Sequence, residues 1–98
     1  MSKKEFCIMP PNAYYCTMRT PTYCHRHEVF FGTDNRQKSI RDGCVVFLRP
    51  EMHNMSKYGV HFNKELDLYF KRIGQGAWMD YYGKTKEDFI KEYGRNYL

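Results

Sequence analysis

Hydrophobic and polar positions divide the first half of the chain into two apolar runs with a polar stretch between them. HEVFF, at 27–31, and CVVFLR, at 44–49, are rich in β-branched and aromatic residues, which favours strands. The intervening GTDNRQKSIRDG, at 32–43, is polar and bracketed by glycines, so it predicts a loop with room for one helical turn. Prolines within residues 1–23 exclude a helix there, and we expect an extended segment with at most a short strand in NAYYCTM.

The second half of the chain switches to helical spacing. Pro50 suits the first position of a helix through PEMHNMSK, and GVHFN then breaks the pattern. A long helix is predicted from Asn63, as its N-cap, to Gly83, as its stop. Its apolar positions recur at spacings of three and four, at Leu66, Phe70, Ile73 and Ala77.

Two further signals concern the helices. Gly74 and Gly76 lower helix propensity by about 1 kcal/mol each, so we expect a close backbone contact to compensate for them. TKEDFIKEYG predicts a last helix, in which Thr85 is the cap, Asp88 stands at the acidic position of a capping box, and Gly94 ends the helix.

Together these elements predict one small α+β domain over residues 1–98. The order is an extended segment at 1–23, a β-hairpin followed by a helix at 24–62, and two helices at 63–98. A chain of 98 residues has a thin core. With nine tyrosines and seven phenylalanines, we expect that core to be rich in aromatic side chains.

Charge and targeting signals narrow the partners only a little. The formal charge of +5 and the pI near 9.1 favour a polyanion, but they also suit an acidic protein surface or no specific partner. MSKKEFCIMPP does not resemble a signal peptide, and no run reaches membrane-spanning length. We therefore expect no membrane partner and a soluble intracellular protein whose four cysteines are reduced. The sequence does not indicate an oligomeric state.

The candidate chemistry lies in the histidines, all four of which fall between positions 25 and 61. His25 and His27 share one face of the first strand, and Glu28 belongs to the other face. His53 lies on the helix after the second strand, which we expect to cross the hairpin, and His61 follows in the break. Imidazoles from strand and helix could share one divalent ion, zinc, manganese or nickel, which would polarise a phosphodiester or acidify water. The alternative is that each histidine is structural.

The same blocks carry a resemblance. RHEVFFG, DGCVVFLRPEMHNMS and GVHFN resemble, in this order, small phage and prophage proteins of the HNH (ββα-metal) endonuclease superfamily. The end of the chain, GQGAWMDYYGKTKEDFIKEYGRNYL, is similar to the C-terminal part of those proteins. The resemblance implies a ββα-metal core, DNA as a partner, a divalent ion (magnesium, manganese, nickel or zinc) and the cytoplasm of a bacterial host cell.

The superfamily pattern assigns roles by position. The resemblance places His27, His53 and His61 as metal ligands, with Glu28 at the general-base position and His25 as the other candidate base. The departures are a glutamate where the base is usually histidine, and no asparagine just before the second strand, for which Asn35 is a weak substitute.

A structural zinc site common in these nucleases is the second departure. Its two cysteine pairs would fall at Cys16 and Arg19, and at Arg49 and Met52, so three of its four ligands are missing. We expect that zinc to have been lost and the cysteines to be small core or rim residues. An alternative zinc site would use the side chains of Cys7, Cys16, Cys24 and His25.

Basic residues beside the proposed metal suggest how DNA would be held. The candidate contacts to phosphate are Arg26, Arg36, Lys38, Arg41 and Lys57. The alternative is that they are ordinary solvated charges.

Two functions from different classes follow. The first is a metal-dependent nuclease. The second is a binding protein on a nuclease-derived scaffold that has lost zinc and turnover. It would occupy a nucleic-acid or protein surface, for instance as a phage-encoded inhibitor of a host defence protein. The altered base and missing asparagine favour the second function, and the retained His27, His53 and His61 favour the first.

Overall fold

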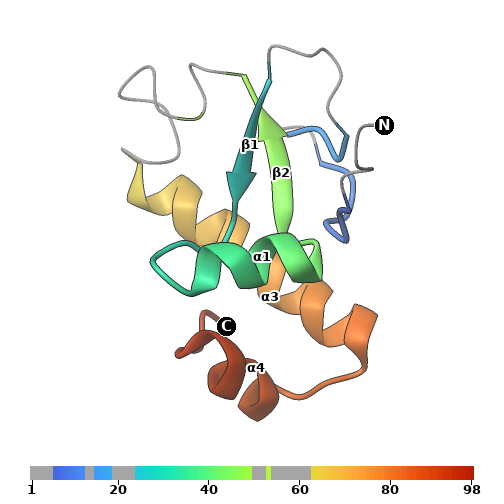
Figure 1. Ribbon diagram of the computed structural model, residues 1–98, viewed down its shortest axis with the longest axis vertical. Coiled ribbons are helices and arrows are strands. Elements are labelled where there is room, and N and C mark those ends of the chain that lie inside the picture. The colour runs from blue at the N-terminus through green and yellow to red at the C-terminus, as the bar shows by residue number, and fades with distance from the viewer. Residues whose placement is uncertain (1–5, 13–14, 19–23, 50–52, 54–62) are drawn as a thin grey trace.

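The computed structural model of the protein describes residues 6–12, 15–18, 24–49, 53 and 63–98. Its helices and strands are β1 (His25–Glu28), α1 (Asn35–Asp42), β2 (Val45–Leu48), α3 (Lys64–Tyr82) and α4 (Lys86–Tyr93). Figure 1 shows the hairpin of β1 and β2 standing above α1, with α3 running behind it and α4 at the opposite end of the molecule. The small α+β class predicted from the sequence is confirmed. None of the helices in these ranges is long and apolar enough to cross a membrane.

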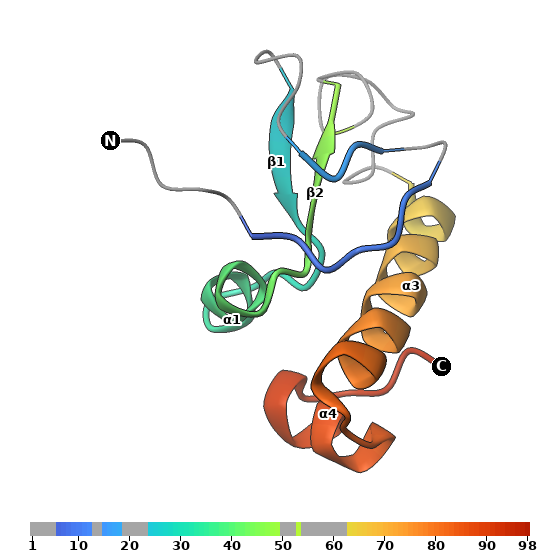
Figure 2. The same ribbon diagram turned by 90° about the vertical axis from the view of Figure 1, so that its right-hand side faces the viewer.

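The two strands pair antiparallel, with His25 opposite Leu48 and His27 opposite Val46. Every residue of β2 is buried, because the hairpin packs on both faces. Beyond β2, Cys16 exchanges two backbone hydrogen bonds with Phe47, at 3.0 and 2.9 Å. Residues 15–18 therefore lie along the second edge of the hairpin (Figure 2), joined to it by an isolated bridge at Cys16. The short strand expected in 12–18 includes residues 13 and 14, which lie outside the described residues.

The predicted first strand was wrong in its bounds. The amide of Val29 still donates to the carbonyl of Cys44 at 2.9 Å, but the chain bends at Val29 and Phe30. That bend sends both side chains into the core, where they are at most 1% exposed. An apolar run was thus read as a strand where it is a strand end followed by a turn.

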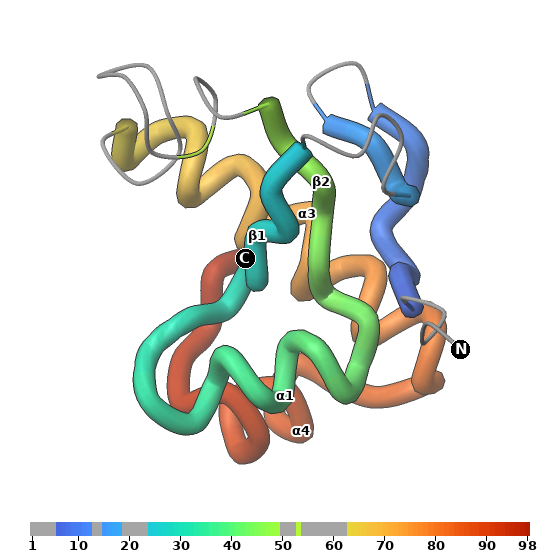
Figure 3. The backbone as a smooth tube through the Cα atoms, turned by 45° about the horizontal axis from the view of Figure 1, so that its top comes forward, coloured from blue at the N-terminus to red at the C-terminus, as the bar shows by residue number. Residues whose placement is uncertain are grey.

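The loop predicted at 32–43 is a second correction, since it holds the eight-residue helix α1 between the two strands. Its buried side chains are polar: Ser39 and Asp42. The Ser39 hydroxyl donates to the carbonyl of Phe30 at 2.6 Å and accepts from the amide of Phe30 at 3.0 Å. Gly43 ends the helix at a φ of 83°, a conformation that glycine adopts without strain. The tube in Figure 3 shows α1 crossing beneath the hairpin, next to α4.

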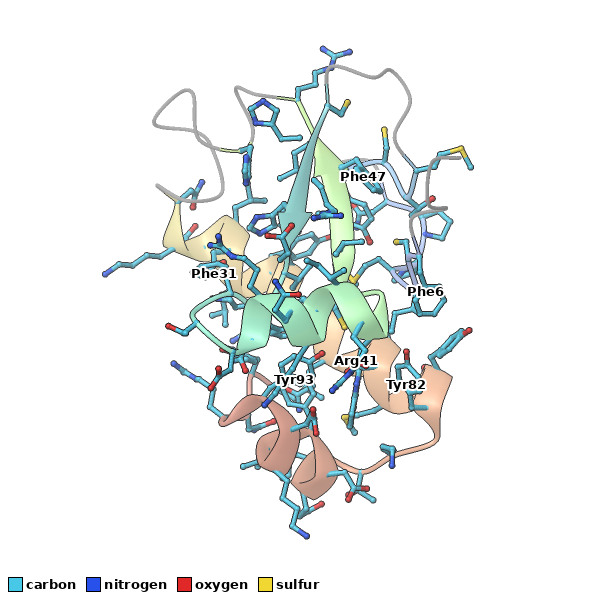
Figure 4. All side chains as sticks on the ribbon, viewed as in Figure 1. Phe6, Phe31, Arg41, Phe47, Tyr82 and Tyr93 are labelled. Carbon is cyan, nitrogen blue, oxygen red and sulfur yellow. The ribbon has the colours of Figure 1, made fainter. Side chains whose placement is uncertain are left out.

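The Asp42 carboxylate joins three helices. Its Oδ2 atom accepts hydrogen bonds from Trp78 Nε1 at 2.9 Å and Tyr93 OH at 2.8 Å, and Arg41 binds both carboxylate oxygens at 2.7 and 2.8 Å. The hydroxyl of Tyr82 donates to the backbone carbonyl of Asp42 at 2.8 Å. Figure 4 shows Arg41, Tyr82 and Tyr93 gathered where α1 meets α3 and α4. A buried carboxylate is tolerated only with such partners.

The two C-terminal helices follow the sequence signals. The Asn63 side chain accepts from the amides of Glu65 and Leu66, each at 3.1 Å, and Thr85 and Asp88 form the predicted capping box. Of the predicted face of α3, Phe70 is fully buried, whereas Leu66, Ile73 and Ala77 are only half-buried. The most buried positions of α3 are Phe70, Gly74, Gln75 and Trp78.

Aromatic rings fill the space between α3, α4 and the bend after β1. Phe30 lies 5.1 Å from Phe89, 4.7 Å from Tyr93 and 5.6 Å from Tyr97, measured between ring centroids. The buried Gln75 side chain fixes the chain end, because it accepts from the amide of Tyr97 at 2.7 Å and donates to Asn96 Oδ1 at 2.8 Å. The aromatic-rich core expected from composition is present.

The two glycines inside α3 make a matched pair of variants. A Cβ at Gly74 would lie 3.1 Å from Phe30 Cζ and from Val29 Cγ1, whereas a Cβ at Gly76 would have nothing within 4 Å. The close contact predicted at Gly74 is therefore confirmed, and that at Gly76 was wrong. We expect Gly74→Ala to destabilise the protein by about 1–2 kcal/mol through overpacking. Gly76→Ala should stabilise it by up to about 1 kcal/mol through helix propensity. Chemical denaturation measures both, and equal effects would contradict this packing.

The second prediction concerns Asp42. Although burial acts to raise it, hydrogen bonds from Arg41, Trp78 and Tyr93 hold the pKa of the Asp42 carboxyl below its usual value. This carboxylate therefore contributes stability above its unfolded pKa of about 3.9, and the contribution is lost as pH falls through the folded value. Asp42→Asn should cost about 2 kcal/mol at pH 7 and lower Tm by roughly 10 °C.

The control for Asp42→Asn is Asp80→Asn, on the exposed side of α3, which should change stability by less than about 0.5 kcal/mol. Thermal melts between pH 7 and pH 2 test the pH dependence. The acid-induced loss should be smaller in Asp42→Asn than in the parent protein, and equal losses would exclude Asp42 as its source.

Candidate metal centre

Three histidines meet on one side of the hairpin. His25 and His27 come from β1, two residues apart, so they lie on the same face of the strand. His53 follows β2 in the chain, where its amide donates to the carbonyl of Arg49 at 3.1 Å. Its ring centroid lies 5.3 Å from that of His25 and 5.2 Å from that of His27. His53 thus contacts both strand histidines.

The three side chains differ in exposure. His27 is 1% exposed, and its ring lies 6.0 Å from that of Phe31 and 6.3 Å from that of Phe70. His25 and His53 are half-buried. His27 is therefore buried among aromatic side chains, whereas His25 and His53 are partly open to solvent.

The closest approach is between the Nδ1 atoms of His25 and His53, which are 3.1 Å apart. Two imidazole nitrogens bound to one tetrahedral zinc ion, each about 2.0–2.1 Å from it, are roughly 3.3 Å from each other. The observed separation suits a chelating pair with only a slight adjustment. It equally suits a hydrogen bond in which one neutral ring donates and the other accepts. The pair can therefore exist with or without an ion.

A complete ligand set is not assembled by the part of the chain that the structure describes. There, no three or more His, Cys, Asp or Glu side chains are placed to hold one ion as they stand. His61 and Lys57 lie outside the described residues. The His25–His53 pair supplies two nitrogen ligands. An ion bound to both would have its remaining coordination positions open to water or substrate.

Glu28, at the expected general-base position, is engaged elsewhere. Its Oε2 atom accepts a hydrogen bond from Arg26 Nε at 3.1 Å, and its Oε1 atom lies 3.5 Å from Arg36 Nε. This agrees with the alternation along β1, which gives Arg26 and Glu28 one face and His25 and His27 the other. The carboxylate and the imidazoles therefore form two separate groups.

Two of the basic residues expected at DNA instead connect α1 to α4. Lys38 Nζ donates to the carbonyl of Glu92 at 2.6 Å. Arg41 Nη2 pairs with the Glu92 carboxylate at 2.7 Å, in addition to its bonds with Asp42. Asn35, the substitute for the missing asparagine, donates to the carbonyl of Tyr93 at 3.0 Å. These three residues have structural contacts, which no local sequence signal predicts because their partners are more than fifty positions away.

The cysteines are dispersed around the hairpin. Cys24 and Cys44 are buried, Cys7 is half-buried, and Cys16 is exposed. Burial raises the pKa of the Cys44 thiol to about 12, so that thiol stays protonated and unreactive at neutral pH. The Cys7 thiol donates to the carbonyl of Val45 at 3.0 Å. Within the described residues, Cys7, Cys16, Cys24 and His25 are not gathered around one point.

Comparison with known proteins adds no assignment. No protein-family model, no curated protein and no solved structure matches the chain significantly.

The sequence placed His25 as a candidate base and as a ligand of the alternative zinc site, and the structure places its Nδ1 atom 3.1 Å from that of His53. The HRH spacing already predicts that His25 and His27 lie on one face of the strand, because side chains two positions apart share a face. The sequence did not show where along β1 the His53 ring would lie. The structure places it beside both His25 and His27.

Metal affinity tests this geometry directly. The protein should bind Ni²⁺ or Zn²⁺ in isothermal titration calorimetry, and His25→Ala or His53→Ala should each weaken binding at least about tenfold, as expected when one of two nitrogens is removed. Cys16→Ser is the control, because it removes an exposed thiol that could itself bind these ions. Unchanged affinity in both histidine variants, or loss in Cys16→Ser, would contradict a site at the imidazole pair.

Proposed function

We propose that this protein is an HNH-like, metal-dependent endonuclease that acts on DNA, with His25 and His53 holding its divalent ion. The observation that carries the proposal is the 3.1 Å separation of the two Nδ1 atoms. That separation is close to the roughly 3.3 Å expected for two nitrogens on one tetrahedral ion. The resemblance in the order of the sequence blocks supports the same function.

In this proposal, the three histidines of the cluster have different roles. His25 and His53, half-buried at the solvent side, would bind the ion and leave part of its coordination sphere open to a phosphodiester. His27, buried beneath them, packs against the His53 ring at 5.2 Å and holds its orientation. A bound ion would polarise the phosphodiester and stabilise the departing oxygen.

Charge supports DNA as the substrate. The chain carries a formal charge of +5, which favours association with a polyanion. Because Lys38 and Arg41 are tied to α4, the phosphate contacts would come from other basic residues. Within the described residues, the other two members of the predicted set are Arg26 of β1 and Arg36 of α1.

One observation favours a second candidate, a DNA- or protein-binding protein on a nuclease-derived scaffold without turnover. Glu28 is paired with two arginines and is not grouped with the histidines. If the carboxylate is the base that the chemistry needs, this arrangement would not support cleavage. The same assay separates the two candidates.

Plasmid nicking tests the proposed function. Supercoiled plasmid should be nicked in Mg²⁺, Mn²⁺, Ni²⁺ or Zn²⁺ and not in EDTA, and His53→Ala should lower the rate at least about a hundredfold because it removes a ligand whose ion stabilises the transition state. Asp80→Asn, exposed on α3, is the matched control and should keep the parental rate. DNA binding without nicking in any of these ions would exclude the nuclease and support the binder.

A further inference from the structure

We infer that Arg26 and Arg36 form a contact for the phosphodiester backbone of DNA, and that the Glu28 carboxylate takes the place of that phosphate in the free protein. This inference rests on the proposed function only in taking DNA as the partner. It gives Glu28 a role different from that of a general base, namely an internal competitor for the arginine pair.

The geometry of the three side chains carries the argument. One carboxylate engages both guanidinium groups, with Arg26 Nε on Oε2 at 3.1 Å and Arg36 Nε 3.5 Å from Oε1. Two like charges are thereby brought to one place from separate elements, β1 and the first turn of α1. A guanidinium binds carboxylate and phosphate through the same planar array of N–H donors.

Exposure indicates which members can exchange partners. The Arg36 side chain is 56% exposed and that of Arg26 is 35% exposed, whereas that of Glu28 is 15% exposed. The arginines can therefore turn toward an incoming anion while Glu28 stays in place. Ion pairs between partly exposed side chains stabilise little, and a phosphate offers the guanidinium groups more acceptor oxygens than the carboxylate does.

The position of the arginines relative to the histidines favours a long polyanion as the occupant. Arg26 lies between His25 and His27 in β1, on the other face of the strand. An extended chain of phosphates that follows the hairpin can meet the arginine pair with one phosphate and present another to the imidazole side. A single small anion could occupy only one of the two faces.

The first test measures phosphate contacts by the salt dependence of duplex binding, using fluorescence anisotropy in EDTA so that neither metal binding nor cleavage enters. Arg36→Ala should weaken binding several-fold and reduce the slope of log affinity against log salt by about 0.9, the contribution of one phosphate contact. Lys86→Ala removes one charge from α4, at the far end of the molecule (Figure 1), and should leave the slope unchanged.

The second test separates a competitor from a base. Glu28→Gln should tighten duplex binding several-fold, because both arginines lose their internal partner. Glu65→Gln, which removes the same charge from an exposed position at the start of α3, should change affinity much less. Circular dichroism checks that each variant is folded. If Glu28→Gln does not fold, the Arg36→Ala variant, which changes an exposed side chain, still tests the inference.

Three outcomes would overturn the inference: an unchanged salt slope in Arg36→Ala, no gain in affinity in Glu28→Gln, or no duplex binding at all. Displacement of the duplex by polyglutamate as readily as by unlabelled DNA at equal charge would also overturn it, because the partner would then be an acidic protein. The proposed nuclease can fail independently. A protein without metal binding or nicking that still shows both variant effects in EDTA retains this arginine contact.

Discussion

The carboxylate of Asp42 is the constraint on which the arrangement of this small domain depends. It is 7% exposed, and a buried carboxylate without donors would cost more free energy than a domain of this size can lose. Its donors come from α1, α3 and α4 through Arg41, Trp78 and Tyr93. Satisfying one side chain therefore requires three helices to adopt one mutual position. This is the role that disulfides or a structural metal play in many domains with thin cores.

The same constraint extends to the histidine pair through α1. Ser39, one turn before Asp42, binds both backbone groups of Phe30, the second residue after β1. Anchoring α1 on α3 and α4 thus anchors the end of β1. The strand then pairs with β2 in a single register, with His25 opposite Leu48 and His27 opposite Val46. His53 follows β2 closely, so the register of the hairpin decides whether its ring meets those of His25 and His27. The geometry of the candidate centre is a consequence of packing at the other end of the hairpin.

What could be predicted from the sequence was what local chemistry determines. The caps of α3 and α4 depend on side chains within three residues of the helix start, at Asn63, Thr85 and Asp88, and these were predicted correctly. The shared face of His25 and His27 follows from strand alternation alone. Helix α1 could not be predicted in this way, because its buried residues are Ser39 and Asp42. A helix that buries polar side chains has no apolar period, and its reason for folding lies in donors contributed by distant elements. The wrong expectation at Gly76 has the same origin, since only the packed structure shows that Val29 and Phe30 approach Gly74.

The formal charge counted from the sequence is also insufficient, because it does not show which basic residues form ion pairs within the fold. The formal charge of +5 counts every basic residue equally, yet Lys38 and Arg41 are committed to Glu92 and Asp42 within the fold. Both side chains stabilise the contact between α1 and α4. Arg26 and Arg36 share one carboxylate, that of Glu28, at a partly exposed position. The formal total therefore does not tell which basic side chains already have acidic partners within the fold. Strand β1 carries imidazoles on one face and, on the other, the Arg26–Glu28 pair, which Arg36 of α1 joins.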